Sequence, residues 1–235
     1  MNSRYLLKAQ KAIVSRLWLM SVLALLVLSV VALLSYSPLL EAGFYSDDWT
    51  FLALSRHGDG PLGFFVHDHS FTYMYRPVAM GTWWVMTQLS GVEAAGHYLF
   101  ATILHVATCL LVMATLYTLS VRLWLVLAAG LLLIAHPTSL ITVSWLADRF
   151  DLMLSFGVVL GFYATSLLPK RPRLSLLLML LSVVVALCSK ESGLALMPVL
   201  AIGIWFSGHS LSFRVRLIVT FVLLGLLYFV ARYLV

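Results

Sequence analysis

Charged residues, cysteine and the motifs of familiar soluble enzymes are all scarce in this chain of 235 residues. Charged side chains make up 10% of the sequence and hydrophobic ones 62%, whereas a soluble domain is about a quarter charged and about half apolar. A single water-soluble fold is therefore excluded, and so is a disordered chain. The mean hydropathy of +1.02 instead predicts an all-α integral membrane protein, long enough for about seven spans of ~20 apolar residues.

No signature of a phosphate-binding loop, a serine hydrolase or a zinc enzyme is present. The two cysteines, Cys109 and Cys188, fall in apolar runs toward opposite faces of the membrane, which argues against a disulfide. The sequence His67-Asp68-His69 resembles part of a metal ligand set, but nothing nearby completes the set at a familiar spacing. We therefore expect no cofactor and no bound metal.

The net charge of +6 reports orientation in the membrane and not a nucleic-acid partner. Ten of the fifteen basic residues flank apolar runs: Arg4, Lys8, Lys11, Arg16, Arg122, Lys170, Arg171, Arg173, Arg214 and Arg216. All nine carboxylates occur in the alternate set of loops: Glu41, Asp47, Asp48, Asp59, Asp68, Glu93, Asp148, Asp151 and Glu191. Because Lys and Arg concentrate in cytoplasmic loops, the basic head 1–16 is predicted to be cytoplasmic and the acidic loops extracytoplasmic. The compact length favours a bacterial inner membrane.

The apolar runs predict seven spans in one transmembrane module that covers residues 1–235. They are Leu17–Leu34, Leu99–Leu119, Leu123–Ala135, Leu152–Leu168, Leu174–Cys188, Leu194–Phe206 and Leu217 to the C-terminus. Residues 41–96 form a large first external loop with short helices, residues 97–235 carry helices two to seven, and residues 138–151 form a short outer segment. The third, fifth and sixth spans cover only ~20–23 Å of a ~30 Å hydrocarbon core. Either these helices extend beyond the apolar runs, or their polar outer ends lie below the headgroup plane.

Eight residues on the predicted outer side form the candidate site: Asp47, Asp48, Arg76, His136, Arg149, Lys190, Glu191 and Arg232. The adjacent carboxylates Asp47 and Asp48 raise each other's pKa near an apolar surface, which suits a catalytic base. The same pair also suits a solvated turn or a helix N-cap. Arg76, held between a tyrosine and a proline, requires either a carboxylate partner or a phosphate.

The remaining candidates also have a structural alternative. Lys190-Glu191 lies between two short apolar runs, where a charged pair marks a functional site or closes a hairpin with a local ion pair. Arg149 either pairs with a neighbouring aspartate at a helix end, beside His136, or binds a ligand. Arg232 either extends to the headgroups or contacts a lipid phosphate. A carboxylate facing several cations suits transfer from an anionic lipid-linked donor, because the carboxylate deprotonates the acceptor and the cations stabilise the leaving phosphate.

Five short motifs occur in this order along the chain: Asp47-Asp48, Tyr75-Arg76-Pro77, His97 with His105, His136-Pro137…Trp145…Arg149-Phe150-Asp151, and Ser189-Lys190-Glu191. The series resembles the GT-C superfamily of integral-membrane glycosyltransferases, and most of all the branch that uses polyprenyl-phosphate sugars and includes protein O-mannosyltransferases. The resemblance implies about seven conserved transmembrane helices and a large external loop that bears the acidic motif. It implies that an aspartate of this motif is the base, with Asp47 the better match.

The resemblance further implies that Arg149, Lys190 and Arg232 contact the lipid phosphate, while Arg76 and His136 match motif positions of less defined role. We therefore expect inverting transfer of a sugar from a polyprenyl-phosphate donor to a glycan or protein acceptor outside the cytoplasm. Members of the superfamily are usually much longer, so the chain is expected to be the N-terminal module and to work with a partner chain that supplies the missing C-terminal part. The alternative is a non-catalytic membrane protein, namely an accessory subunit, a truncated module or a lipid-sugar flippase.

Overall fold

The computed structural model describes residues 22–23, 25–57, 60–66 and 74–234, which contain helices, turns and irregular segments but no strand. The α-helices are α2 (Asp48–Arg56), α3 (Pro77–Ser90), α4 (Ala94–Thr118), α5 (Leu123–Ala135), α6 (Pro137–Ser144), α7 (Arg149–Leu167), α8 (Pro172–Leu187), α9 (Leu196–Trp205) and α10 (Leu211–Leu234). Short 3-10 helices are η1 (Ser37–Glu41), η2 (Gly63–Phe65), η3 (Leu146–Asp148) and η4 (Glu191–Ala195). An earlier apolar helix, Leu25–Glu41, ends in η1. The basic head 1–16 lies outside the described residues.

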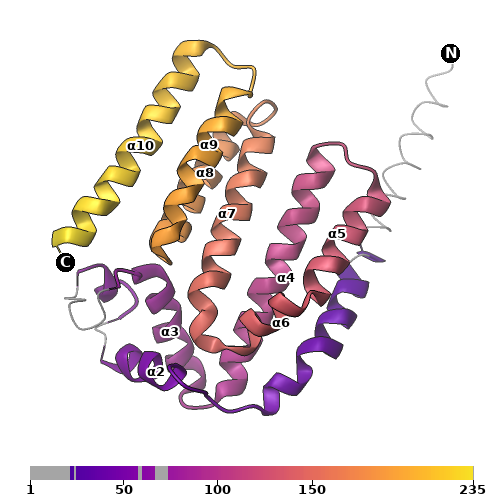
Figure 1. The fold of residues 1–235 in the computed structure, drawn as a ribbon, viewed down its shortest axis with the longest axis vertical. Helices are drawn as coiled ribbons and strands as arrows, with labels where there is room; N and C mark the ends of the chain where they lie inside the picture. The colour runs from indigo at the N-terminus through magenta and orange to yellow at the C-terminus, as the bar shows by residue number, and fades with distance from the viewer. Residues whose placement is uncertain (1–21, 24, 58–59, 67–73, 235) are drawn as a thin grey trace.

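The long helices lie side by side, with α10 at one edge, α7 and α4 in the middle, and α5 with Leu25–Glu41 at the other edge (Figure 1). The shorter helices α2, α3 and α6 gather at one end of this bundle, where α7 begins and α10 ends. We call this the outer end, because the sequence predicts it to be extracytoplasmic. The predicted active-site loops therefore meet at one end of the bundle.

Proline is the first residue of three helices. Pro77, Pro137 and Pro172 occupy the first turns of α3, α6 and α8, where the missing N–H is not needed and the fixed φ suits a helix. Between α5 and α6 the chain bends by 49° at His136-Pro137. The ring of His136 caps α6 by accepting a hydrogen bond from the Thr138 backbone N–H at 3.2 Å. The outer segment predicted over 138–151 thus contains a helix that hydropathy alone does not reveal.

Helix α7 connects the two apolar cores of the bundle. One core includes Trp83 and Leu146, and the other includes Met179 and Leu200. The close approach of α7 to α8 depends on Gly157, since a Cβ at this position would lie 2.8 Å from the backbone nitrogen of Ala186. This distance is too short for a non-bonded contact, so the glycine fixes the spacing of the central helix pair.

Three described helices are long and apolar enough to cross a membrane, namely Ala94–Thr118, Leu146–Leu167 and Leu211–Leu234, and the bent pair α5–α6 makes a fourth candidate. Leu25–Glu41, Pro172–Leu187 and Glu191–Trp205 are apolar but shorter. The chain therefore has the character of an all-α membrane protein with three to four candidate spans among the described residues. The sequence predicts seven, because it counts every apolar run, whatever the length of its helix.

The ends of the helices can be compared with the ends of the apolar runs in the sequence. The predicted run Leu123–Ala135 coincides with α5. Helices α4 and α10 each begin before the predicted spans, because helical structure continues through polar residues such as His97 and Arg214 that end an apolar run. Of the predicted first span, the structure describes residues 22–34 except 24.

Replacing Gly157 by alanine is expected to lower the stability of the bundle by about 1–3 kcal/mol, because α7 and α8 must move apart to admit the methyl group. The thermal unfolding midpoint in detergent, followed by size-exclusion chromatography, measures this loss. Gly225→Ala is the matched control, because a Cβ there meets no heavy atom nearer than 3.7 Å. Equal midpoints for the two variants would contradict the proposed α7–α8 spacing.

Candidate functional site

Charged side chains from four distant segments lie at the outer end of the bundle. Arg76 precedes the first turn of α3, and Asp151 lies in the first turn of α7. Lys190 and Glu191 start η4, and Arg232 lies in the last turn of α10. These residues are far apart in the chain, and the packing of α3, α7, η4 and α10 brings them together.

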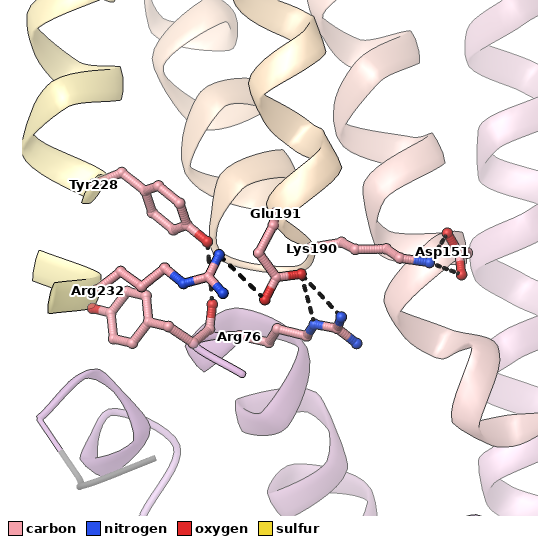
Figure 2. Close-up of polar contacts among 7 residues, drawn as sticks. Arg76, Asp151, Lys190, Glu191, Tyr228 and Arg232 are labelled. Carbon is pink, nitrogen blue, oxygen red and sulfur yellow. Dashed lines mark hydrogen bonds and ion pairs between the residues drawn. The ribbon is translucent and has the colours of Figure 1, made fainter. Parts of the chain in front are cut away.

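Glu191 lies between two arginines (Figure 2). Arg76 donates from Nη2 to Glu191 Oε2 at 2.9 Å and from Nε to the same oxygen at 3.3 Å. Arg232 Nη1 lies 3.7 Å from the other oxygen, Oε1. We call these three residues the Glu191 cluster. With two guanidinium groups and one carboxylate, the cluster has a formal charge of +1.

Further contacts stabilise the segments that carry the Glu191 cluster. The N–H of Val78, in the first turn of α3, donates to the carbonyl oxygen of Cys188 at 2.9 Å. The Tyr228 hydroxyl on α10 donates to the Tyr75 carbonyl oxygen at 3.4 Å. The guanidinium of Arg76 also lies 4.8 Å from the ring centroid of Phe150, at the start of α7. Helices α3, α7 and α10 and the turn before η4 are thereby held around the cluster.

Burial raises the pKa of Glu191, but the hydrogen bond from Arg76 and the positive charges of Arg76 and Arg232 outweigh it, so the net pKa lies below its ordinary value. The side chains remain partly accessible, with exposed fractions of 15% for Arg76 and 24% for Glu191. The carboxylate is therefore ionised at neutral pH, and the cluster is reachable from outside.

A second ion pair lies beside the cluster. Lys190 Nζ donates to both carboxylate oxygens of Asp151, at 2.7 Å and 2.5 Å. The two side chains are about a third exposed, at 31% and 35%. Asp148, one turn earlier in the chain, lies within electrostatic range of both groups. The turn before η4 thus binds the start of α7 as well as the start of α3.

The carboxylate of Asp48 is fully buried and bonded to two backbone N–H groups. Its Oδ1 accepts from Ala147 at 2.6 Å, and its Oδ2 accepts from Tyr45 at 2.9 Å. Burial and the negative charge of Asp47 raise the pKa of Asp48. The hydrogen bonds from the two N–H groups and the positive charge of Arg149 lower it. The net shift is upward. Asp48 therefore joins the turn before α2 to the turn before α7.

Asp47 differs from its neighbour because its side chain is exposed. The Ser46 hydroxyl donates to Asp47 Oδ1 at 2.5 Å. Ser46 itself has a φ of 51°, in the left-handed region that non-glycine residues seldom adopt, which marks a tight turn. Of the two carboxylates, Asp47 is thus the one that an external molecule can reach.

Arg149 lies inside the bundle and not in the Glu191 cluster. Its side chain is fully buried, and Nη2 lies 3.0 Å from the ring nitrogen Nδ1 of His97. The guanidinium lies 4.2 Å from the centroid of Trp83 and 5.2 Å from that of Phe100. Its Nε and Nη1 have no hydrogen-bond partner among the described residues. In this conformation the guanidinium supports the packing of α3, α4 and α7 and is closed to a ligand.

The eight predicted site residues therefore divide into groups. Arg76 and Arg232 both contact Glu191, and Lys190 pairs separately with Asp151. Asp48 and Arg149 are interior, while Asp47 and His136 are exposed. The eight candidates do not include Tyr228 or Asp151, although Asp151 stands in the motif Arg149-Phe150-Asp151 and in the first turn of an apolar helix.

Metal binding receives no support from the described part of the chain. No group of three or more histidine, cysteine, aspartate or glutamate side chains is placed there to hold an ion. The candidate ligands His67, Asp68 and His69 lie outside the described residues. What the described residues can do chemically is to present the exposed carboxylate of Asp47 and several cations at the same end of the bundle.

Asp48→Asn is expected to destabilise the protein by about 1–3 kcal/mol, because an amide in this place can accept from only one of the two buried N–H groups. Asp47→Asn is the matched control and should change stability by no more than about 0.5 kcal/mol, since the side chain is exposed. Thermal unfolding midpoints in detergent give both values. A larger loss for Asp47→Asn than for Asp48→Asn would contradict the assigned roles.

Glu191→Gln is expected to reduce stability by roughly 1 kcal/mol at neutral pH, a discounted value for partly exposed ion pairs. Because the folded protein lowers the pKa of Glu191 below its ordinary 4.5, the stabilisation is present above that value and disappears as the pH falls through the lowered one. Unfolding midpoints of wild type and variant should thus converge in acid. Glu93→Gln controls for the change of net charge, and a difference that grows in acid would contradict the ion pairing.

Comparisons of this chain with family models, with curated proteins and with solved structures find no match. The geometry of the charged groups at the outer end is therefore the basis on which a function is proposed. Its main features are the Glu191 cluster, the Lys190–Asp151 pair and the exposed carboxylate of Asp47.

Proposed function

We propose that this protein is an integral-membrane glycosyltransferase of the GT-C type, with about seven transmembrane segments and its active site on the extracytoplasmic face of a bacterial inner membrane. It transfers a sugar from a polyprenyl-phosphate carrier to a glycan or protein acceptor. The observation that carries this proposal is the convergence of Arg76 and Arg232 on one carboxylate, at the end of the bundle that also presents Asp47.

The charges of the Glu191 cluster favour a phosphate ligand. Guanidinium groups present planar pairs of N–H donors that match phosphate oxygens, and charge-assisted hydrogen bonds are stronger than neutral ones. The cluster has a formal charge of +1, while the neighbouring Lys190–Asp151 pair is neutral. The apolar helices α8, α9 and α10 run away from the cluster (Figure 1). A lipid-linked phosphate can therefore meet the arginines while its chain stays in the bilayer.

The proposed reaction is a single displacement. The Asp47 carboxylate accepts the proton of an acceptor hydroxyl while the acceptor oxygen forms a bond to C1 of the sugar. The bond between C1 and the phosphate oxygen breaks, and the phosphate leaves with the electron pair. Arg76, Arg232 and Lys190 stabilise the charge that grows on it. One displacement inverts the configuration at C1 and requires no nucleophile from the protein.

Asp48 and Arg149 act indirectly in this proposal. Asp48 fixes the turn that carries Asp47 through its bonds to the backbone of Tyr45 and Ala147. Arg149 holds the start of α7 against α4 through His97. Both are positioning residues, because neither is exposed to a substrate.

Membranes that contain this chain are expected to release free polyprenyl phosphate from a polyprenyl-phosphate sugar when cell extract supplies acceptors. Asp47→Asn should lower the rate by about 10²–10⁴-fold, the range for loss of a general base. Arg76→Gln should lower it by about 10²–10³-fold, because stabilisation of the leaving charge is lost. Chromatography of the released lipid measures these rates at matched protein levels.

Arg56→Gln is the control for Arg76→Gln, since Arg56 is an exposed arginine at the end of α2. Glu93→Gln serves the same purpose for Asp47→Asn. Full rates are expected in both controls. No release from wild-type membranes supplied with donor and acceptors would overturn the catalytic proposal and favour the non-catalytic alternative, an accessory subunit or a flippase.

A further inference from the structure

Glu191 occupies the space between two arginines without filling it. Its Oε2 is hydrogen-bonded to Arg76, but the 3.7 Å from Arg232 Nη1 to Oε1 is longer than a hydrogen bond. The Arg232 side chain is also the most exposed of the three, at 36%. Glu191 therefore hydrogen-bonds Arg76 but reaches Arg232 by electrostatic attraction only. Arg232 also has a hydrogen bond with the Tyr228 side chain.

A phosphate monoester matches this space better than a carboxylate. It has three free oxygens and a charge of about −1.5 to −2 at neutral pH, against two oxygens and a charge of −1 for Glu191. It can therefore accept from both guanidinium groups at hydrogen-bond length. Glu191 is 24% exposed and can turn toward water at small cost, since exposed ion pairs stabilise little.

The surrounding backbone allows the side chain to move while the main chain stays in place. The Cys188 carbonyl oxygen is bonded to the Val78 N–H at 2.9 Å, and the Lys190 N–H donates to the Ala186 carbonyl oxygen at 3.2 Å. Lys190 is also held by Asp151. Rotation of the Glu191 side chain breaks none of these contacts, so the backbone next to Arg76 and Glu191 stays in place when the carboxylate leaves.

We infer that Glu191 is an internal anion that occupies the phosphate site between Arg76 and Arg232, and that a phosphate-bearing ligand binds by displacing it. The inference rests on the proposed function, because the leaving group of the proposed reaction, polyprenyl phosphate, is a phosphate monoester that would bind at this site. Glu191 thereby offsets part of the positive charge of the two arginines in the absence of ligand and weakens the binding of every anion that enters. A lipid phosphate and a free phosphate share the required chemistry.

The test measures binding to the full-length protein in nanodiscs of neutral phosphatidylcholine, with farnesyl phosphate as the probe. Glu191→Gln should bind it about 3- to 10-fold more tightly than wild type, because a competing charge of modest interaction strength is removed. Glu191→Asp, which retains a shorter carboxylate, should give a smaller increase and provides the readout should the glutamine variant fail to fold. Arg76→Gln and Arg232→Gln should each bind more weakly.

Glu93→Gln is the matched control, because it removes an exposed carboxylate at the same end of the bundle. Its affinity should equal that of wild type, and tightening as large as that of Glu191→Gln would overturn the inference by showing a general charge effect. Weaker binding by both Glu191 variants would also overturn it, since Glu191 would then be needed to hold the arginines. If the two arginine variants bind as well as wild type, the phosphate does not bind between them, and the proposed function fails together with the inference.

Two further probes separate the sources of the phosphate. Farnesol lacks the phosphate, and tighter farnesol binding by Glu191→Gln would overturn the inference. Inorganic phosphate lacks the lipid chain. Tightening for inorganic phosphate as well as farnesyl phosphate supports a site that recognises the phosphate alone, and tightening for farnesyl phosphate only supports a lipid headgroup.

Discussion

The hydrogen bond from the Ala147 backbone N–H to the buried Asp48 carboxylate is the contact on which the outer end of the bundle depends. At 2.6 Å, it joins residues 99 positions apart. It fixes the turn before α2, which presents Asp47, against the turn before α7. Because α7 connects the two apolar cores and begins with Arg149 and Asp151, a shift of this turn would move the ion pair of Lys190 as well. Burial strengthens the bond, since a low local dielectric favours hydrogen bonds to a charged acceptor.

The charged groups at this end differ in burial. The buried groups support the structure, and the exposed groups can exchange their partners. Asp48 and Arg149 are fully buried, so removing their partners would leave a charge in an apolar interior, at a cost of several kcal/mol. Glu191 and Arg232 are partly exposed at 24% and 36%, and water can take over their contacts. The interior groups therefore fix the geometry, while the groups at the surface can change partners. A site that binds and releases a charged ligand needs both kinds.

The sequence predicted the helical class, the limits of α5 and the gathering of charged loops at one end, because these follow from local hydropathy and from the placement of basic residues. It did not predict which charged residues form ion pairs with each other. Arg76 pairs with Glu191 across 115 positions, and Lys190 pairs with Asp151 across 39. Such pairings depend on which helix ends meet after packing. The burial of Arg149 was hidden for the same reason, since an arginine beside an aspartate suggests a local ion pair, and only the packing of α3 and α4 places it on His97 and Trp83.

In the proposed topology, the short length of α8 sets the depth of the Glu191 cluster in the membrane. With 16 residues, the helix extends ~24 Å, against a hydrocarbon core of ~30 Å. In the proposed topology its outer end, followed directly by Lys190 and Glu191, lies below the headgroups. Charges near that depth are stabilised by pairing, which Asp151, Arg76 and Arg232 provide. The phosphate of a membrane lipid lies in the headgroup layer just above this depth, and α10, which carries Arg232, is at the edge of the bundle (Figure 1). A lipid-linked donor would therefore reach the cluster sideways from the bilayer, while the acceptor reaches Asp47 from the water.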